Sequence, residues 1–109
     1  MFGFRKLDVY KCAVQALPLA YGLADRADSE MKRQLKRAVL SISLNVAEGT
    51  GRRGDDQRQF YRIARGSALE CAAVLDAIVA LGDVEQEETS ALEELLMRIV
   101  AMLTKMSAG

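Results

Sequence analysis

The feature that most limits how this chain can fold is a seam of mostly apolar or small residues with a helical period. Between residues 31 and 49 the seam advances in steps of four and three: Met31, Leu35, Ala38, Ile42, Asn45 and Gly49. Residues 40–46 also alternate between apolar and polar, as a half-buried strand would. Strands run for about four to eight residues, whereas this seam is much longer, so the helical period decides.

Three other segments show the same spacing. Their seams are Leu7, Tyr10, Val14, Leu17, Tyr21 and Ala24; then Phe60, Ala64, Ser67, Cys71, Val74, Ile78 and Leu81; then Leu92, Leu95, Ile99, Met102 and Met106, widened by Leu96 and Leu103. Short breaks between long helices favour antiparallel neighbours. The sequence therefore predicts one all-α domain over residues 1–109. Its fold would be an antiparallel up-and-down four-helix bundle with helices near 7–24, 28–53, 55–82 and 86–106.

Several residues predict how these helices bend, begin and end. Pro18 is expected to kink the first helix without breaking it. Asp28 or Ser29 is placed to cap the second helix. Asp55 or Asp56 would cap the third, because Asp56 and Gln59 have capping-box spacing. Gly82 is expected to end that helix.

Gly49, Gly51 and Gly54 spell G-x-G-x-x-G, the fingerprint of a dinucleotide-binding turn. That turn needs a preceding strand within a parallel sheet, and no second strand is found. Glu48, Asp55 and Asp56 would also repel a phosphate. We therefore expect no nucleotide cofactor. Gly49 is expected to admit a close helix neighbour, as is Gly66, while Gly51 and Gly54 turn the chain.

Cysteine, histidine and hydropathy limit the remaining classes of protein. The chain has two cysteines and no histidine, which excludes a Cys/His zinc site. Cys12 and Cys71 are expected to be buried thiols, as in a reducing compartment. No apolar run approaches the ~18 residues of a membrane span, and the start of the chain is unlike a signal peptide. We expect a cytoplasmic protein without metal or cofactor.

Charge is unevenly distributed along a chain with zero net charge. Residues 26–65 carry +5, residues 66–109 carry −6 and residues 1–25 carry +1. Such asymmetry suggests an anionic partner or two halves of a self-association surface. The candidate nucleic-acid-binding residues, expected at one end of the bundle, are Arg5, Lys6, Lys11, Arg52, Arg53, Arg58 and Arg62. A second group, Lys32, Arg33, Lys36 and Arg37, would lie roughly 25 Å away along the second helix. The alternative is a solvated face, partly paired with acidic residues 83–94 of a neighbouring subunit.

Two stretches, "QLKRAVLSISLNVAEGTGR" and "FYRIARGSALE", resemble the four-helix-bundle proteins encoded in intervening sequences of bacterial 23S ribosomal RNA genes. They are similar also to the accessory variability determinant proteins of diversity-generating retroelements. The opening "LDVYKCA" matches as well, and the resemblance covers about residues 4–80. It implies a cytosolic, non-enzymatic, ring-like homo-oligomer, a pentamer, and binding to structured RNA or DNA.

A polar cluster is expected where the second and third helices face each other. Its members are Asn45, Glu48, Arg65, Ser67 and Glu70, with Arg65 as the cation for one of the carboxylates. Burial would force these groups to find partners and so fix the helix register. The alternative, a catalytic pair of Glu48 and Glu70, lacks a histidine, a serine–base dyad or a metal set.

Apolar residues outside the seams suggest self-association, because large exposed patches are uncommon on monomers. They are Leu19, Leu23, Val39, Leu40, Leu44, Val79, Leu96 and Val100. The alternative is one wide core. The sequence thus favours a non-catalytic oligomeric protein that binds structured RNA or DNA. A protein-interaction scaffold without nucleic acid is the second hypothesis, and an enzyme using Glu48 and Glu70 is the third.

Overall fold

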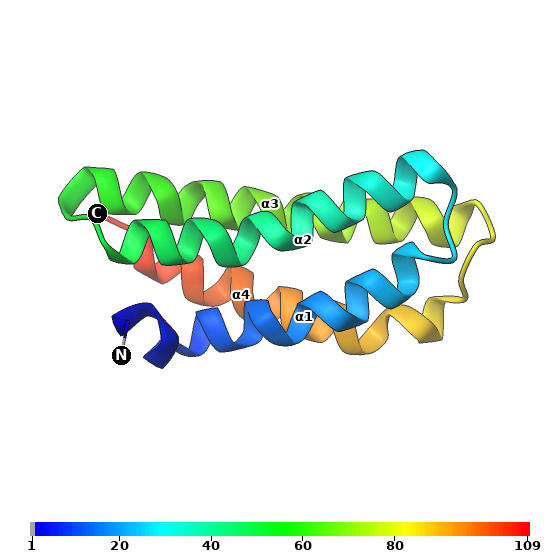
Figure 1. Ribbon diagram of the computed structural model, residues 1–109, viewed down its shortest axis with the longest axis horizontal. Coiled ribbons are helices and arrows are strands. Elements are labelled where there is room, and N and C mark those ends of the chain that lie inside the picture. Colours follow the sequence, from blue (N-terminus) through cyan, green and yellow to red (C-terminus); the bar gives the residue numbers. More distant parts are fainter. Residues whose placement is uncertain (1) are drawn as a thin grey trace.

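The computed structural model describes residues 2–109, which form four α-helices in an up-and-down bundle. They are α1 (Asp8–Ala24), α2 (Ser29–Thr50), α3 (Gly54–Ala80) and α4 (Ser90–Met106). Two short 3-10 helices, η1 (Gly3–Lys6) and η2 (Gln86–Thr89), precede α1 and α4. Successive helices run in opposite directions, and no strand occurs in this part of the chain (Figure 1). The predicted all-α bundle is confirmed.

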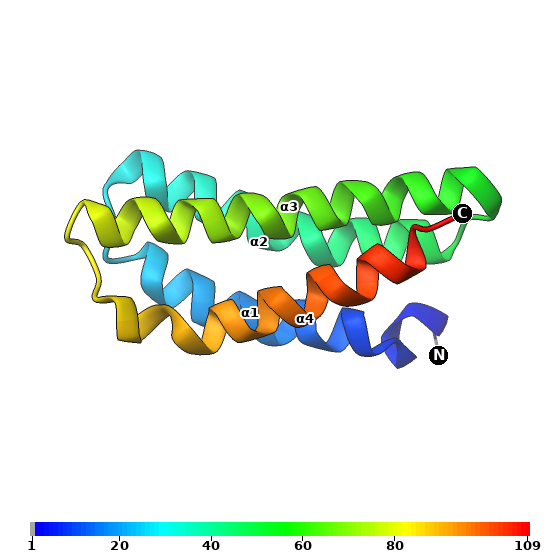
Figure 2. The ribbon, with the colours of Figure 1, turned by 180° about the vertical axis from the view of Figure 1, so that it is seen from behind.

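The order of the helices places two of them at diagonal corners. Both α2 and α4 pack against α1 and α3. Figure 1 views the bundle from the α1–α2 side, and Figure 2 views the α3–α4 side. The α2–α3 turn, η1 and the C-terminus share one end of the bundle. The α1–α2 and α3–α4 connections share the other end, so the two ends are built from different segments.

The helix ends agree with the sequence in part. The Asp28 carboxylate accepts a 2.9 Å hydrogen bond from the Met31 amide and caps α2, as one of the two predicted alternatives had it. Gly82 ends α3 with a φ of 82°, and the amides of Gly82 and Asp83 donate to the carbonyls of Val79 and Ile78. This is the Schellman pattern that favours glycine.

The predicted capping box of α3 is wrong. The helix begins at Gly54, so its N-cap is Arg53, which makes no capping hydrogen bond with its side chain. Asp55 and Asp56 instead lie in the first turn of α3. Carboxylates there still interact favourably with the helix dipole. Gly54 makes this early start feasible because its φ is 57°.

The seam predicted for α1 is wrong, because the face of α1 that packs into the core is rotated about the helix axis relative to that seam. The helix continues through Pro18, but Val14 and Tyr21 of the predicted seam are 41% and 37% exposed. The buried face consists of Val9, Cys12, Ala13, Ala16, Ala20, Leu23 and Ala24. Four of these residues are alanines, which let the neighbouring helices approach. The prediction was wrong because it placed the larger apolar side chains, which lie at the flanks of this face, in the core.

The core runs along the bundle between the four helices. Its largest fully buried side chains include Leu35, Ile42, Leu75, Ile78, Leu92, Ile99 and Leu103. Cys12 and Cys71 are buried free thiols, and burial raises the pKa of the Cys71 thiol to about 12. No helix within residues 2–109 has the length and apolar character that a membrane crossing requires.

Candidate nucleic-acid interface

The predicted basic residues come from four segments that meet at one end of the bundle. η1 carries Arg5 and Lys6, and it packs against α1 and α2. Lys11 follows in the first turns of α1. The α2–α3 turn carries Arg52 and Arg53, while Arg58 and Arg62 lie in the first turns of α3. We call this set the basic end (Figure 1).

Two members of the basic end are neutralised by their own helices. Arg52 pairs with Asp56 at 2.9 Å and with Glu48 at 3.3 Å, and these contacts raise its pKa. Its guanidinium also lies 4.6 Å from the centroid of the Phe60 ring. Arg58 pairs with Asp55, and the Arg58 guanidinium holds the pKa of that carboxyl below its ordinary value. These arginines therefore carry little uncompensated charge.

The remaining members have no carboxylate partner among residues 2–109. Arg5, Lys6, Lys11 and Arg53 are all exposed, and we call these four the free cations. Arg62 is exposed and also has no carboxylate partner among these residues, but its guanidinium donates to Gln59 Oε1 and to the Ser107 carbonyl, each at 3.4 Å. The basic end thus offers a smaller charged set than the sequence suggested.

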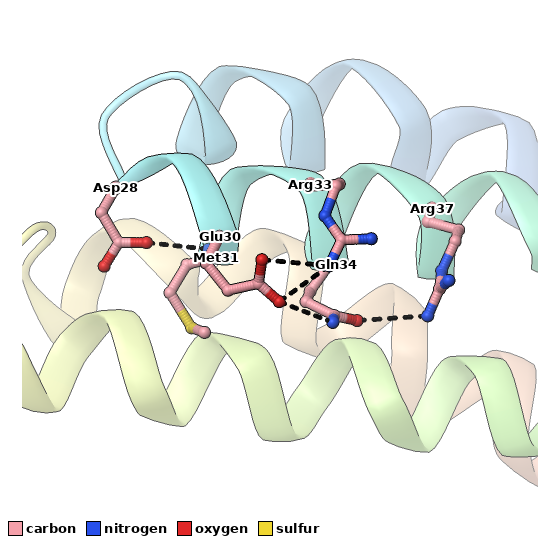
Figure 3. Close-up of polar contacts among 6 residues, drawn as sticks. All are labelled: Asp28, Glu30, Met31, Arg33, Gln34 and Arg37. Carbon is pink, nitrogen blue, oxygen red and sulfur yellow. Dashed lines mark hydrogen bonds and ion pairs between the residues drawn. The ribbon is translucent and has the colours of Figure 1, made fainter.

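The second basic group lies near the opposite end and is largely engaged with carboxylates. Lys32 and Lys36 share Asp25 at 3.4 and 3.0 Å, and the hydrogen bond from Lys36 is the main cause of the lowered pKa of that carboxyl. Figure 3 shows how Arg33 and Gln34 both donate to Glu30. Arg37 reaches only the Gln34 amide oxygen, at 3.4 Å. Nearby, Arg26 pairs with Glu88 across the two connections.

A half-buried polar network does join α2 to α3, with a membership that differs from the prediction. Asn45 Nδ2 donates to the carbonyl and the hydroxyl of Ser41, each at 2.9 Å. The Ser41 hydroxyl lies 2.8 Å from that of Ser67. Ser41 was missed, although its position one helical turn before Asn45 was a usable signal. Only Asn45 and Ser67 of the predicted cluster belong to this network.

The charged members of the predicted cluster lie elsewhere. Glu48 and Glu70 are exposed, which corrects the expectation that they are buried. Glu48 pairs with Arg52, and Arg65 Nε donates to the Thr104 hydroxyl at 2.9 Å, linking α3 to α4. A buried carboxylate is costly unless it is paired and hydrogen-bonded, whereas these two remain hydrated. The protomer contains no buried carboxylate pair of Glu48 and Glu70.

The two glycines predicted to permit close packing differ from each other. Gly49 is buried, and a Cβ atom there would lie 2.9 Å from Phe60 Cβ and 3.0 Å from Tyr61 Cε1. The adjacent Thr50 hydroxyl lies 3.1 Å from the Tyr61 hydroxyl. Gly66 is exposed, and a Cβ there would have no neighbour within 4 Å. Only Gly49 is a close-packing position within the protomer.

Apolar side chains remain exposed on two separate surfaces, one between α3 and α4 and one on α2. A groove of about 460 Å³ runs between α3 and α4 on the face shown in Figure 2, where Leu69 is 47% and Met97 73% exposed. On α2, Leu40 is 40% and Leu44 is 59% exposed. Other residues assigned to association are not available, because Leu23, Val39 and Leu96 are buried in the core. Leu19 is exposed, and Val79 and Val100 are half-buried.

Similarity to known proteins extends over nearly the whole chain and is not confined to the basic end. No curated protein matches the sequence. The family described as 23S rRNA-intervening sequence protein matches residues 5–105, which cover the four helices except Met106 and include every member of the basic end. The chain belongs to the family of 23S rRNA-intervening sequence proteins.

Proposed function

We propose that this protein is a non-catalytic, oligomeric, cytoplasmic protein that binds structured RNA or DNA through its basic end. The observation that carries the proposal is that some cations pair with carboxylates of the protomer and others do not. Arg5, Lys6, Lys11 and Arg53 gather at one end of the bundle and are exposed without a carboxylate partner among residues 2–109, while six of the other eleven cations have one. Cations of this kind can bind phosphates without first breaking an internal ion pair.

Electrostatic physics sets the expected character of the binding. Each phosphate neutralised contributes about 0.7–0.9 to the slope of log affinity against log salt. A few free cations per protomer give weak binding that is tolerant of sequence and sensitive to salt. Repetition of the basic end around an oligomer would raise the overall affinity through avidity.

Self-association is part of the proposal, and its support is the pair of exposed apolar faces. The α3–α4 groove is bordered by Asp76 and Glu93, while Arg33 and Arg37 precede Leu40 and Leu44 on α2. The α2 face of one copy therefore complements the groove of another in both apolar character and charge. Because the α2 face and the groove are different surfaces, such contacts are heterologous, and heterologous contacts form a ring when the rotation between neighbouring copies closes. We propose a homopentamer.

The proposed relation to accessory variability determinant proteins rests on the resemblance of residues 34–52 and 60–70 to those proteins. The proposed absence of catalysis rests on the carboxylates: Glu48 and Glu70 are exposed, and neither lines the α3–α4 groove. Catalytic sites are usually enclosed, with convergent polar groups. A protein-interaction scaffold without nucleic acid is the second candidate, favoured by the same apolar groove.

Two measurements on the purified full chain test the proposal. Fluorescence anisotropy with a labelled RNA hairpin and a DNA duplex should show affinity that falls steeply as salt rises. Light scattering should give a mass near five times the 12.0 kDa of one chain. An oligomer that binds neither nucleic acid at low salt supports the scaffold. A 12.0 kDa species contradicts the proposed assembly.

A further inference from the structure

An ordered column of aromatic rings begins at the basic end. The Phe2 and Phe4 rings are stacked, with centroids 5.7 Å apart and an interplanar angle of 19°. Tyr10 extends this column with an edge-to-face contact. Its ring centroid lies 4.8 Å from that of Phe4, with an interplanar angle of 67°. Tyr10 packs against the hydrophobic core, so the column is anchored in the bundle.

The backbone holds the first rings in place. The Arg5 amide donates to the Phe2 carbonyl at 3.2 Å, and the Leu7 amide donates to the Phe4 carbonyl at 3.1 Å. η1 in turn packs against α1 and α2. Phe2 is therefore part of a defined turn, yet 64% of its surface is exposed. An ordered but exposed aromatic ring is available to stack with a partner.

One cation lies over this ring, and another follows it in the same turn. The Arg5 guanidinium lies 5.2 Å from the Phe2 centroid and 5.9 Å from the Phe4 centroid. Lys6 follows in the same turn, and both cations are exposed. A protein surface covering Phe2 would have to remove water from both cations, neither of which has a carboxylate partner among the described residues. A nucleotide instead supplies a planar base for the ring and a phosphate for each cation.

Stacking also discriminates between nucleic-acid structures. A base stacked on an aromatic side chain contributes about 1–3 kcal/mol with little dependence on sequence. Bases within a duplex are already stacked and paired, so only the bases of loops, bulges and ends can occupy an aromatic ring. We propose that the basic end binds unpaired nucleotides, with a base stacked on Phe2 beside Arg5 and its flanking phosphates held by Lys6 and the other free cations. This inference rests on the proposed nucleic-acid binding and specifies which nucleotides are bound.

The test compares an RNA hairpin with the same hairpin whose loop nucleotides are abasic, because the two carry equal charge. Anisotropy titrations use the parent, Phe2→Leu, Phe2→Trp and, as a control, Leu81→Ala. Leu81 is a comparably exposed apolar residue, 61% exposed, at the opposite end of the bundle. Light scattering accompanies each titration.

The parent and Leu81→Ala should bind the intact loop about 5- to 100-fold more tightly than the abasic loop. Phe2→Leu should lose most of this preference and keep the parent's salt slope, while Phe2→Trp should retain the preference. Equal binding of both hairpins by the parent overturns the inference and leaves the proposed function standing. Binding of neither hairpin overturns both. A change in oligomer mass in Phe2→Leu without a change in loop preference assigns Phe2 to a subunit interface and also overturns the inference.

Discussion

The two ends of the bundle use their cations differently. At the end formed by the α1–α2 and α3–α4 connections, which we call the paired end, Arg26 pairs with Glu88 and Lys36 with Asp25. These ion pairs bring the two connections and the start of α2 together. At the basic end, Arg5 and Arg53 have no carboxylate partner among residues 2–109.

Packing holds the basic end together with the ion pairs of Arg52 and Arg58, without its free cations. Gly49 lets α2 approach the Phe60 and Tyr61 side chains of α3, and the Thr50 hydroxyl meets the Tyr61 hydroxyl. The structure of this end therefore does not depend on its free cations. The number of basic residues therefore does not define a binding surface, because their pairing within the protomer decides which charges remain available.

The largest effect is expected when the helix contact at the basic end is disrupted. Gly49→Val places a branched side chain where even a Cβ lies 2.9 Å from Phe60 Cβ. Overpacking of this kind costs about 2–3 kcal/mol, which lowers the melting temperature by roughly 10–15 °C. Thermal denaturation followed by circular dichroism measures the shift. Gly66→Val is the matched control and should change stability by less than about 0.5 kcal/mol. Equal losses at both glycines would contradict the role assigned to the α2–α3 contact.

A smaller loss is expected from the hydrogen bond beside this contact. The Thr50 hydroxyl donates to the Val46 carbonyl, so the buried Tyr61 hydroxyl is the donor to Thr50. Tyr61→Phe removes that bond and should reduce the free energy of unfolding by about 1 kcal/mol. Urea denaturation measures it, with Tyr21→Phe as the control because Tyr21 is 37% exposed. A Tyr61→Phe variant as stable as the parent would show that packing alone holds this end.

The smallest effect is expected at the paired end and depends on pH. Arg26 lowers the pKa of the Glu88 carboxyl, so the pair stabilises the fold above the ordinary pKa of glutamate, about 4.3, and this contribution is lost as pH falls through the lowered value. Arg26→Gln should lower the melting temperature slightly at pH 7 and by less at pH 3, below the ordinary pKa of the Glu88 carboxyl. Arg53→Gln should change it at neither pH. If Arg53→Gln destabilises the protein as much as Arg26→Gln, the two ends do not differ as described.

The sequence predicted the fold well because long helices repeat their pattern many times. The α2 seam buries Leu35, Ala38, Ile42 and Gly49 as expected. The α1 seam was wrong because its buried face is rich in alanine, a residue that a hydropathy pattern weighs lightly. Short-range spacing predicts that a segment is helical, but it does not decide between a face of larger apolar side chains and a face of alanines.

The candidate site was less predictable because ion pairs form between side chains that are distant in sequence. Adjacent arginines can also lie near the same carboxylates, and the sequence does not show which of them pairs. Arg26 meets Glu88 across 62 residues, and no local pattern identifies that pair. Arg52 and Arg53 are adjacent, yet only Arg52 lies one turn from both Glu48 and Asp56. The helix boundary at Gly54 fixes that difference, and the predicted boundary was not accurate enough to reveal it.

The most direct test of the account is a salt titration of RNA-hairpin binding by two variants that lose the same charge. One is Arg5→Gln, Lys6→Gln and Arg53→Gln at the basic end; the other is Lys32→Gln, Arg33→Gln and Arg37→Gln near the paired end. The basic-end variant should lose about 2–3 in the log–log salt slope and about 10- to 100-fold in affinity near 0.1 M salt. The other variant should stay within about threefold of the parent, because two of its three cations, Lys32 and Arg33, already face carboxylates. Equal losses in both variants would contradict the claim that cations without a carboxylate partner determine binding, because net charge alone would then explain the affinity.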